Sequence, residues 1–207
     1  MNDTKNIAYR DRLQSKETWW KQLLDVQRPY RANLRRLDMG FVLEVGCGIG
    51  RNLLSLRKIG IEAIGVDHNA HSVEEAVRRG FNALTVETFN SMYSEKKRQF
   101  DTLLVSHVLE HMTKPEAANL VSLYLPYLKQ QGRIIVITPQ EKGFSSDPTH
   151  VEFMNFDILS ELLDQNDLTV VEKYSFPLPR FFGKLFTHNE FVVVATRLPQ
   201  IGDNCEK

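Results

Sequence analysis

The feature that most constrains the fold is a short apolar run that leads directly into three alternating glycines. Residues 39–45 end at Gly46-Cys47-Gly48-Ile49-Gly50, and apolar side chains then recur at helical spacing up to Gly60. Glycine tolerates the backbone angles of a tight turn and lets a ligand approach the main chain without a Cβ in the way. The segment therefore predicts a strand, a ligand-binding turn and a helix in succession.

The same alternation continues along the rest of the chain. Strands that alternate with helices pair in parallel through right-handed crossovers. Too few residues separate the last two strands for a crossover helix, so the last strand is predicted to be antiparallel. The expected fold is a three-layer α/β Rossmann-like sandwich around a seven-stranded, mostly parallel sheet. Beyond the first strand, the pattern predicts strands at 61–66, 82–86, 100–106, 133–138, 169–176 and 190–197, and helices at 70–79, 115–129 and 157–165.

Length and local pattern predict how the chain is organised. Its 207 residues suffice for one domain with a buried core. Helical spacing over residues 16–37, divided at Pro29, predicts an N-terminal helical cap at 1–37 in front of a ligand-binding domain at 38–198. The polar residues 199–207 are expected to form a disordered tail.

Charge and composition exclude several classes of protein. Lys plus Arg and Asp plus Glu number 26 each, so no overall basic field favours nucleic acid as a partner. The chain shows neither a signal-peptide pattern at its start nor an apolar run of about 18 residues, the length that predicts a membrane span. Its two cysteines, Cys47 and Cys205, lie far apart in unlike contexts, so a disulfide is not expected. A cytoplasmic protein without a membrane span fits these features.

The residues around the turn restrict the class of ligand that it can bind. The second strand ends at Asp67, where a carboxylate can accept hydrogen bonds from ribose hydroxyls. The dinucleotide-binding motif G-x-G-x-x-G is absent, because the third glycine position is Arg51 when counted from Gly46 and Leu53 when counted from Gly48. The residues after Gly50 do not match a P-loop. Glu44 would repel a pyrophosphate but suits a ligand that carries an ammonium group.

The segments VLEVGCGIGRNL and AIGVDHN resemble the first two cofactor motifs of class I S-adenosylmethionine-dependent methyltransferases. FDTLLVSHVLEHM and LPYLKQQGRIIVITPQ are similar to the regions of the family's fourth and fifth strands, so the resemblance covers most of residues 37–197. It implies that S-adenosylmethionine is the cofactor, that the glycine turn surrounds its methionine part, and that Asp67 binds its ribose. The adenine would lie against residues after the third strand, at Glu87 or near Thr88. The full set implied for the cofactor is Glu44, Gly46, Cys47, Gly48, Gly50, Asp67, His68, Thr88, Phe89, Ser106 and His107.

Methyl transfer to a hydroxyl or an amine requires positioning and removal of a proton. His150, in the long loop after the fifth strand, is the first candidate base, and His111, beyond the fourth strand, is the second. Either histidine could instead have only a structural role. A metal site could be assembled from His107, His111, His150 and Asp147. Their spacing matches no tight ligand motif, so no metal is expected.

The resulting hypothesis is a methyltransferase that acts on an oxygen or nitrogen of a small molecule or glycan, as a monomer or homodimer. Two alternatives remain open: a non-catalytic S-adenosylmethionine-binding partner subunit, and a methyltransferase for RNA or protein. The aromatic, proline-rich and basic segment at 176–184 could line an acceptor pocket, and the N-terminal cap, with Trp19, Trp20, Tyr30 and Arg31, could close over the ligands.

Overall fold

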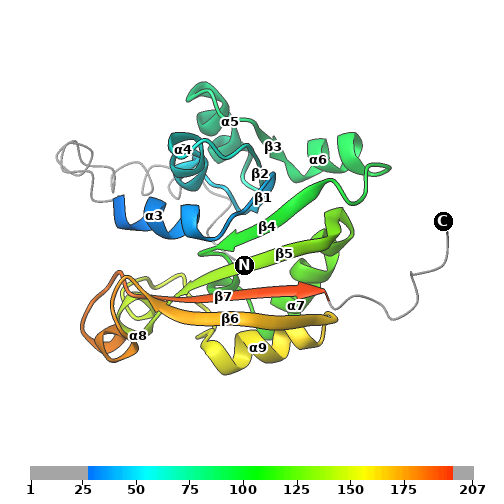
Figure 1. Cartoon of the computed structure of the whole chain (residues 1–207). Helices are drawn as coiled ribbons and strands as arrows, with labels where there is room; N and C mark the ends of the chain where they lie inside the picture. The colour runs from blue at the N-terminus through cyan, green and yellow to red at the C-terminus, as the bar shows by residue number, and fades with distance from the viewer. Residues whose placement is uncertain (1–27, 198–207) are drawn as a thin grey trace.

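The computed structural model describes residues 28–197, which form a single twisted sheet covered by helices on both faces (Figure 1). The sheet has seven strands in the order β3-β2-β1-β4-β5-β7-β6. The strands are β1 (Val42–Val45), β2 (Ala63–Asp67), β3 (Ala83–Thr85), β4 (Phe100–Ser106), β5 (Leu128–Pro139), β6 (Leu168–Phe176) and β7 (Glu190–Arg197).

The strand directions confirm the expected topology. β1 pairs in parallel with β2 and β4, and β3 and β5 continue the parallel arrangement on either side. β7 lies antiparallel between β5 and β6. The strand order reverses between β1 and β4, and in open α/β sheets ligands bind outside the carboxyl ends of the strands at such a switch point. The residues that follow β1 and β4 are therefore placed at the position where a ligand is expected.

Hydrophobic packing on both faces of the sheet holds the three layers together. On one face, Leu43 and Val45 pack with the helices that follow β3, β4 and β5. On the other face, Val42 packs with Leu34 and Leu56 from the two helices nearest the glycine turn. Successive strand residues point to opposite faces, so one short strand supplies both cores.

The helices separate into two layers. The first layer holds α3 (Arg28–Arg36), α4 (Arg51–Lys58) and α5 (Ala70–Arg78). The second holds α6 (Val86–Tyr93), α7 (Lys114–Tyr124) and α9 (Phe156–Asp164). Short helical segments complete the described chain: η2 (Leu109–His111), η3 (Leu125–Tyr127), α8 (Glu141–Phe144) and η4 (Arg180–Lys184).

Two local differences from the expected elements have clear causes. The third strand ends at Thr85 because the Thr85 side chain caps α6, accepting a hydrogen bond from the Thr88 N–H at 3.2 Å. The helix expected to reach residue 129 ends at Tyr124, two residues before Pro126, which has no backbone N–H to continue an α-helix. β5 then begins at Leu128.

Some expectations fall outside the described residues. Residues 28–36 of the expected cap are helical as α3, and Pro29 lies within it. The rest of the expected N-terminal cap, with Trp19 and Trp20, lies outside residues 28–197, as does the tail at 199–207. Within 28–197, every helix is too short or too polar to cross a membrane.

Candidate cofactor and acceptor site

The glycine turn has the backbone conformation that its sequence predicts. Gly46, Gly48 and Gly50 all have positive φ, at 78°, 52° and 83°, which side chains of L-residues rarely adopt. A Cβ at Gly46 would lie only 2.3 Å from Val108 Cγ2, so glycine is required there by space as well as by angle. The turn thus brings bare main chain to the end of β1.

Asp67 fastens this turn to the end of β2. Its Oδ2 accepts the Gly48 N–H at 2.7 Å, and its Oδ1 accepts the Asn69 N–H at 2.8 Å. Asn69, not Asp67, is the N-cap of α5, because its side chain accepts the Ser72 N–H. Asp67 is therefore available at the strand tips to position both the turn and a ligand hydroxyl.

Glu44 is a buried acid whose charge the described residues do not fully compensate. It is 1% exposed, and its Oε2 has no hydrogen-bond partner. Burial, together with the nearby Asp67 carboxylate, raises the pKa of Glu44 to about 8, although hydrogen bonds from Asn52 and the Leu53 N–H oppose the shift. A buried oxygen without a partner is costly, and a cationic ligand group would satisfy it. The residues at this turn therefore fit a ligand that carries an ammonium.

His107 lies between two carboxylates just beyond β4. Its Nδ1 is 3.1 Å from Glu110 Oε1 and its Nε2 is 2.8 Å from Glu190 Oε1. Partial desolvation would lower the pKa of His107, whose side chain is 44% exposed, but the two acids outweigh it and raise the pKa to about 10. A protonated imidazole donates both N–H groups, so His107 cannot serve as a base at neutral pH. Its backbone φ of 57° is strained for a residue with a side chain.

The two candidate bases lie side by side, although they are far apart in sequence. The ring centroids of His111 and His150 are 4.8 Å apart. Burial lowers the pKa of His111 below its usual value, which favours the neutral imidazole. The loop that carries His150 is attached by its main chain, because the Val151 and Glu152 N–H groups both bond to the Glu110 carbonyl at 2.7 and 3.2 Å.

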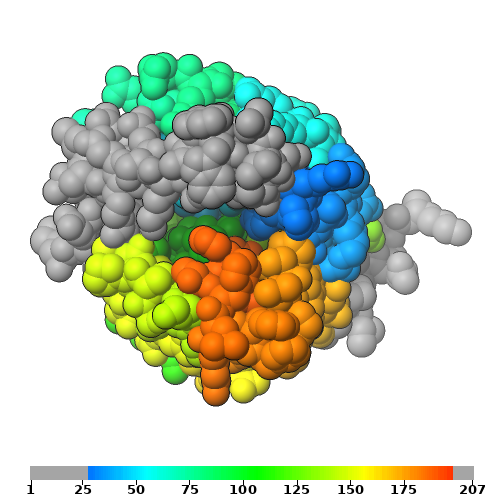
Figure 2. All heavy atoms as spheres, turned by 90° about the vertical axis from the view of Figure 1, so that its left-hand side faces the viewer, coloured from blue at the N-terminus to red at the C-terminus, as the bar shows by residue number. Residues whose placement is uncertain are grey.

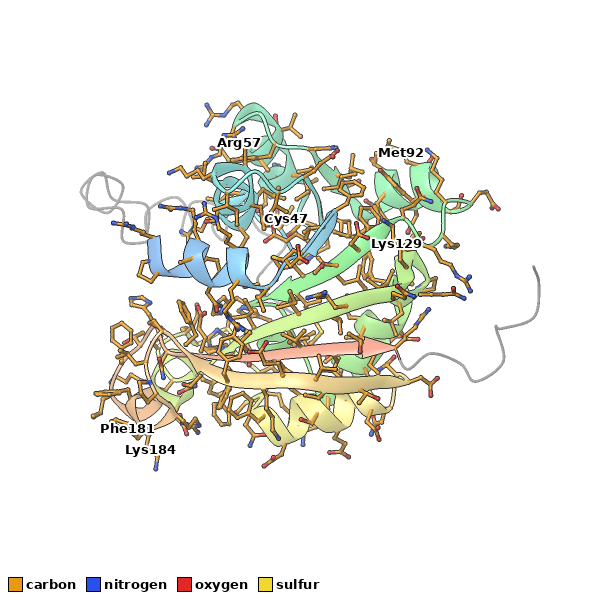
Figure 3. The ribbon with its side chains drawn as sticks, viewed as in Figure 1. Cys47, Arg57, Met92, Lys129, Phe181 and Lys184 are labelled. Atoms are coloured by element: carbon orange, nitrogen blue, oxygen red, sulfur yellow. The ribbon has the colours of Figure 1, made fainter. Side chains whose placement is uncertain are left out.

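The remaining residues of the predicted cofactor set occupy different environments. Cys47 is buried, and burial raises the pKa of its thiol well above the usual value; Figure 3 shows it inside the molecule near α4. Ser106 is buried next to Tyr30, whereas His68 and Thr88 are exposed. The Phe89 ring is fully buried and stacks on Tyr93, so it supports the core beneath the expected adenine position.

Two further groups lie at this edge of the sheet: Tyr30, which the sequence places in the N-terminal cap, and Glu190, which no sequence motif singles out. Burial raises the pKa of the phenol of Tyr30, from α3, and a hydrogen bond with Ser106 opposes the shift. Glu190, the first residue of β7, has one oxygen on His107 and a second buried oxygen without a partner. Glu190 opens an ordinary strand in the sequence, and only the antiparallel pairing of β7 beside β5 brings it to the end of β4.

A buried amide network fixes the segment that follows β6. Gln140 Nε2 donates to Ser175 Oγ at 2.6 Å and to the Glu190 carbonyl at 2.9 Å, and Asn189 Nδ2 donates to Gln140 Oε1 at 2.9 Å. The segment anchored in this way carries exposed apolar groups, with Phe181 69% and Leu185 76% exposed. Figure 3 shows Phe181 and Lys184 projecting from it.

The carboxyl ends of the parallel strands share one face of the molecule. Figure 2 shows this face, where green atoms lie recessed between the blue atoms of α3, the yellow-green atoms near residue 150 and the orange atoms before β7. The segments that follow the parallel strands therefore meet on this face, as expected for a class of α/β enzymes that bind a nucleoside and a second substrate together.

Comparison with known proteins assigns the family. The family model described as "Methyltransferase domain" matches residues 23–195, so the chain belongs to the methyltransferase domain family. The class I fold and S-adenosylmethionine as the cofactor, both implied by the motifs, are confirmed at the level of the family. A search among curated proteins finds no match.

Solved structures with the same fold have different substrates. A SAM-dependent methyltransferase from Archaeoglobus fulgidus is 21% identical, with a TM-score of 0.66, over 86% of this chain and 97% of its own. Magnesium protoporphyrin IX methyltransferase from Synechocystis, bound to SAH, is 17% identical, with a TM-score of 0.66, over 95% and 98%. 1,6-Didemethyltoxoflavin-N1-methyltransferase from Burkholderia thailandensis is 20% identical, with a TM-score of 0.61, over 92% and 88%. At these identities the likeness establishes the fold alone.

Proposed function

We propose that this methyltransferase transfers the methyl group of S-adenosylmethionine to an oxygen or nitrogen of a small molecule or glycan. The observation that carries the proposal is Glu44, a buried acid with an unpartnered oxygen beside a turn of three positive-φ glycines. The methionine part of the cofactor offers the ammonium that this oxygen lacks. The cofactor itself supplies the methyl group, on a sulfonium that leaves as a neutral thioether.

Different residues of the chain would bind the methionine, ribose and adenine parts of the cofactor. Glu44 and the main chain of the turn would hold the methionine part, and Asp67 with its neighbour His68 would hold the ribose. The adenine would lie over the start of α6, where Thr88 is exposed above the buried Phe89 ring. Ser106 and His107, at the end of β4, would lie closest to the sulfonium, and the charge of His107 is balanced there by two carboxylates.

The acceptor would bind on the opposite side of that sulfonium. His150 and His111 lie beyond the end of β4, and a neutral imidazole there can take a proton from a hydroxyl or an amine. The exposed apolar side chains of Phe181 and Leu185 would contact an organic acceptor. One solved structure with this fold is named as a methyltransferase of magnesium protoporphyrin IX, and another holds 1,6-didemethyltoxoflavin, which supports an acceptor of this size.

An assay of methyl transfer to a panel of acceptors tests the proposal. The purified protein is incubated with S-adenosylmethionine and a panel of hydroxylated, amine-bearing and sugar acceptors, and release of S-adenosylhomocysteine is measured. We expect release with a small-molecule or sugar acceptor, and a large loss of that release in His150→Ala and His111→Ala with cofactor affinity unchanged. Cofactor binding without turnover on any acceptor would instead favour a non-catalytic subunit. Turnover on RNA or protein alone would overturn the assignment of the acceptor.

A further inference from the structure

We propose that Glu110, His111 and His150 form a binding site for a divalent transition-metal ion at the acceptor side of the proposed active site. One carboxylate oxygen of Glu110 and one ring nitrogen of each histidine all lie within 4.8 Å of one another. Two imidazoles and one carboxylate are a donor set that Zn²⁺, Fe²⁺ and Mn²⁺ accept, with coordination positions left over for another ligand.

The carboxylate gives an independent reason to expect a cation. Glu110 is 0% exposed, and its Oε1 pairs with His107. Its Oε2 is buried and has no hydrogen-bond partner within residues 28–197. Because a buried carboxylate oxygen is rarely left without a partner, this oxygen is the group that a metal ion would satisfy.

The hydrogen bonds of the two histidines favour metal binding. His150 Nδ1 donates to the Phe144 carbonyl at 2.7 Å, and His111 Nδ1 donates to the Thr149 carbonyl at 3.1 Å. A neutral imidazole that donates from Nδ1 carries its lone pair on Nε2. Metal-binding histidines in general have this arrangement, in which a backbone carbonyl fixes the ring and its tautomer.

The three side chains are held before any metal binds. Glu110 and His111 are neighbours in η2, and the Glu110 carbonyl accepts two N–H groups from the residues that follow His150. Tetrahedral coordination places ligand atoms about 3.4 Å apart, so small side-chain rotations would close the site. Two of these ligands, His111 and His150, belong to the metal set considered from the sequence, but they are 39 residues apart and match no spacing motif, and Glu110 was not in that set.

The inference rests on the proposed function and makes the role of the two histidines more specific. As ligands, they would act on the acceptor through the metal. A hydroxyl bound at an open position has a lowered pKa, gives its proton to solvent water, and leaves an oxygen able to attack the methyl carbon as the carbon–sulfur bond breaks. The matching substrate class is an acceptor with a hydroxyl that can coordinate a metal.

The test measures metal binding directly. The full chain is stripped with a chelator and titrated calorimetrically with Zn²⁺, Mn²⁺ and Mg²⁺ in turn, without cofactor or acceptor. We expect one Zn²⁺ per chain, weaker binding of Mn²⁺, and no comparable binding of Mg²⁺, which prefers oxygen ligands. Glu110→Gln and His150→Ala should each weaken Zn²⁺ binding by about 100-fold or more, whereas His71→Ala, an exposed histidine on α5, should leave it unchanged.

A thermal-unfolding readout guards against variants that fail to fold. Zn²⁺ should raise the melting temperature of the wild type and of His71→Ala, but not of a folded Glu110→Gln or His150→Ala. Absence of a stoichiometric site, or equal binding by all four proteins, would overturn the inference. S-adenosylmethionine is titrated separately into the metal-free protein. Cofactor binding without metal binding would leave the proposed function standing and remove only the metal site.

Discussion

His107 and Glu190 join the end of β4 to the start of β7, with an Nε2 to Oε1 distance of 2.8 Å. β5 lies between these two strands, so the contact crosses the edge of the sheet where the site is built. Together with Glu110 on the other ring nitrogen, it holds His107 as a cation and orients both acids. The acid nearest the two candidate bases is thus connected to the last strand of the fold.

The first prediction concerns this pair. Glu190→Gln removes one of the two acids that raise the pKa of His107 to about 10. With partial desolvation then opposed by Glu110 alone, we expect the pKa of His107 to fall by about one unit or more. An NMR titration of the His107 ring measures the change, with the exposed Glu161→Gln on α9 as the control. An unchanged pKa would mean that Glu190 does not stabilise the imidazolium.

The second prediction concerns Glu44 in the absence of cofactor. Its folded-state pKa of about 8 lies above its unfolded value of 4.5, so its contribution to stability is present below pH 4.5 and is lost as the pH rises toward 8. Glu44→Gln does not ionise. The free energy of unfolding of this variant, relative to the wild type, should therefore increase from pH 5 to pH 8.5 by up to roughly 4 kcal/mol.

Urea denaturation at several pH values without cofactor measures this difference. The same titrations with S-adenosylmethionine present serve as the control. The cofactor's ammonium should pair with ionised Glu44, so the ligand should stabilise the wild type more than Glu44→Gln. A stability difference that is independent of pH would contradict a raised pKa for Glu44.

The third prediction separates backbone angle from space in the glycine turn. Gly46 and Gly60 both have a φ of 78°, but a Cβ at Gly46 would meet Val108, whereas at Gly60 it would meet nothing within 4 Å. Gly60→Ala should lose about 1–2 kcal/mol of stability from its angle alone. Gly46→Ala should lose clearly more and should also lose cofactor binding. Chemical denaturation compares the two variants, and equal losses would show that the contact with Val108 is unimportant.

The fourth prediction concerns the segment after β6. Phe181, in the segment proposed to contact the acceptor, is 69% exposed, and Leu123 is 52% exposed on α7. Phe181→Ser should raise the KM for the acceptor with little change in kcat or in affinity for S-adenosylmethionine, because it removes only apolar contact with the acceptor. Leu123→Ser should change none of these values. Unaltered steady-state kinetics in Phe181→Ser would remove this segment from the acceptor site.

The fold could be predicted from the sequence almost entirely. Hydrophobic periodicity located all seven strands, and the short connection before Glu190 predicted the antiparallel last strand. Periodicity did not reveal α6, because Val86 continues the apolar pattern of the strand and the capping role of Thr85 has no effect on that pattern. Periodicity also extends the helix before β5 to residue 129, because the apolar pattern continues past Pro126 although the helix ends at Tyr124.

The site could be predicted only where its residues are consecutive. The glycine turn and Asp67 follow strands directly, so their positions at the strand tips were evident. The contacts of His107 with Glu190, and of Glu110 and His111 with His150, depend on how distant segments meet. The first of these contacts arises from the pairing of β5 with β7, and the second from the attachment of the 140–153 loop to η2. No local sequence pattern encodes contacts between such distant segments.

The central claim is that the turn between β1 and α4, closed by Asp67, binds S-adenosylmethionine. Calorimetric titration of the cofactor into wild type, Asp67→Ala and the exposed Asp164→Asn tests it most directly. We expect binding by the wild type and by Asp164→Asn, and binding weakened by roughly 10-fold to 100-fold in Asp67→Ala, as the loss of charged hydrogen bonds to ribose implies. Equal affinity in all three proteins, or binding of NADH in preference to S-adenosylmethionine, would contradict the assignment.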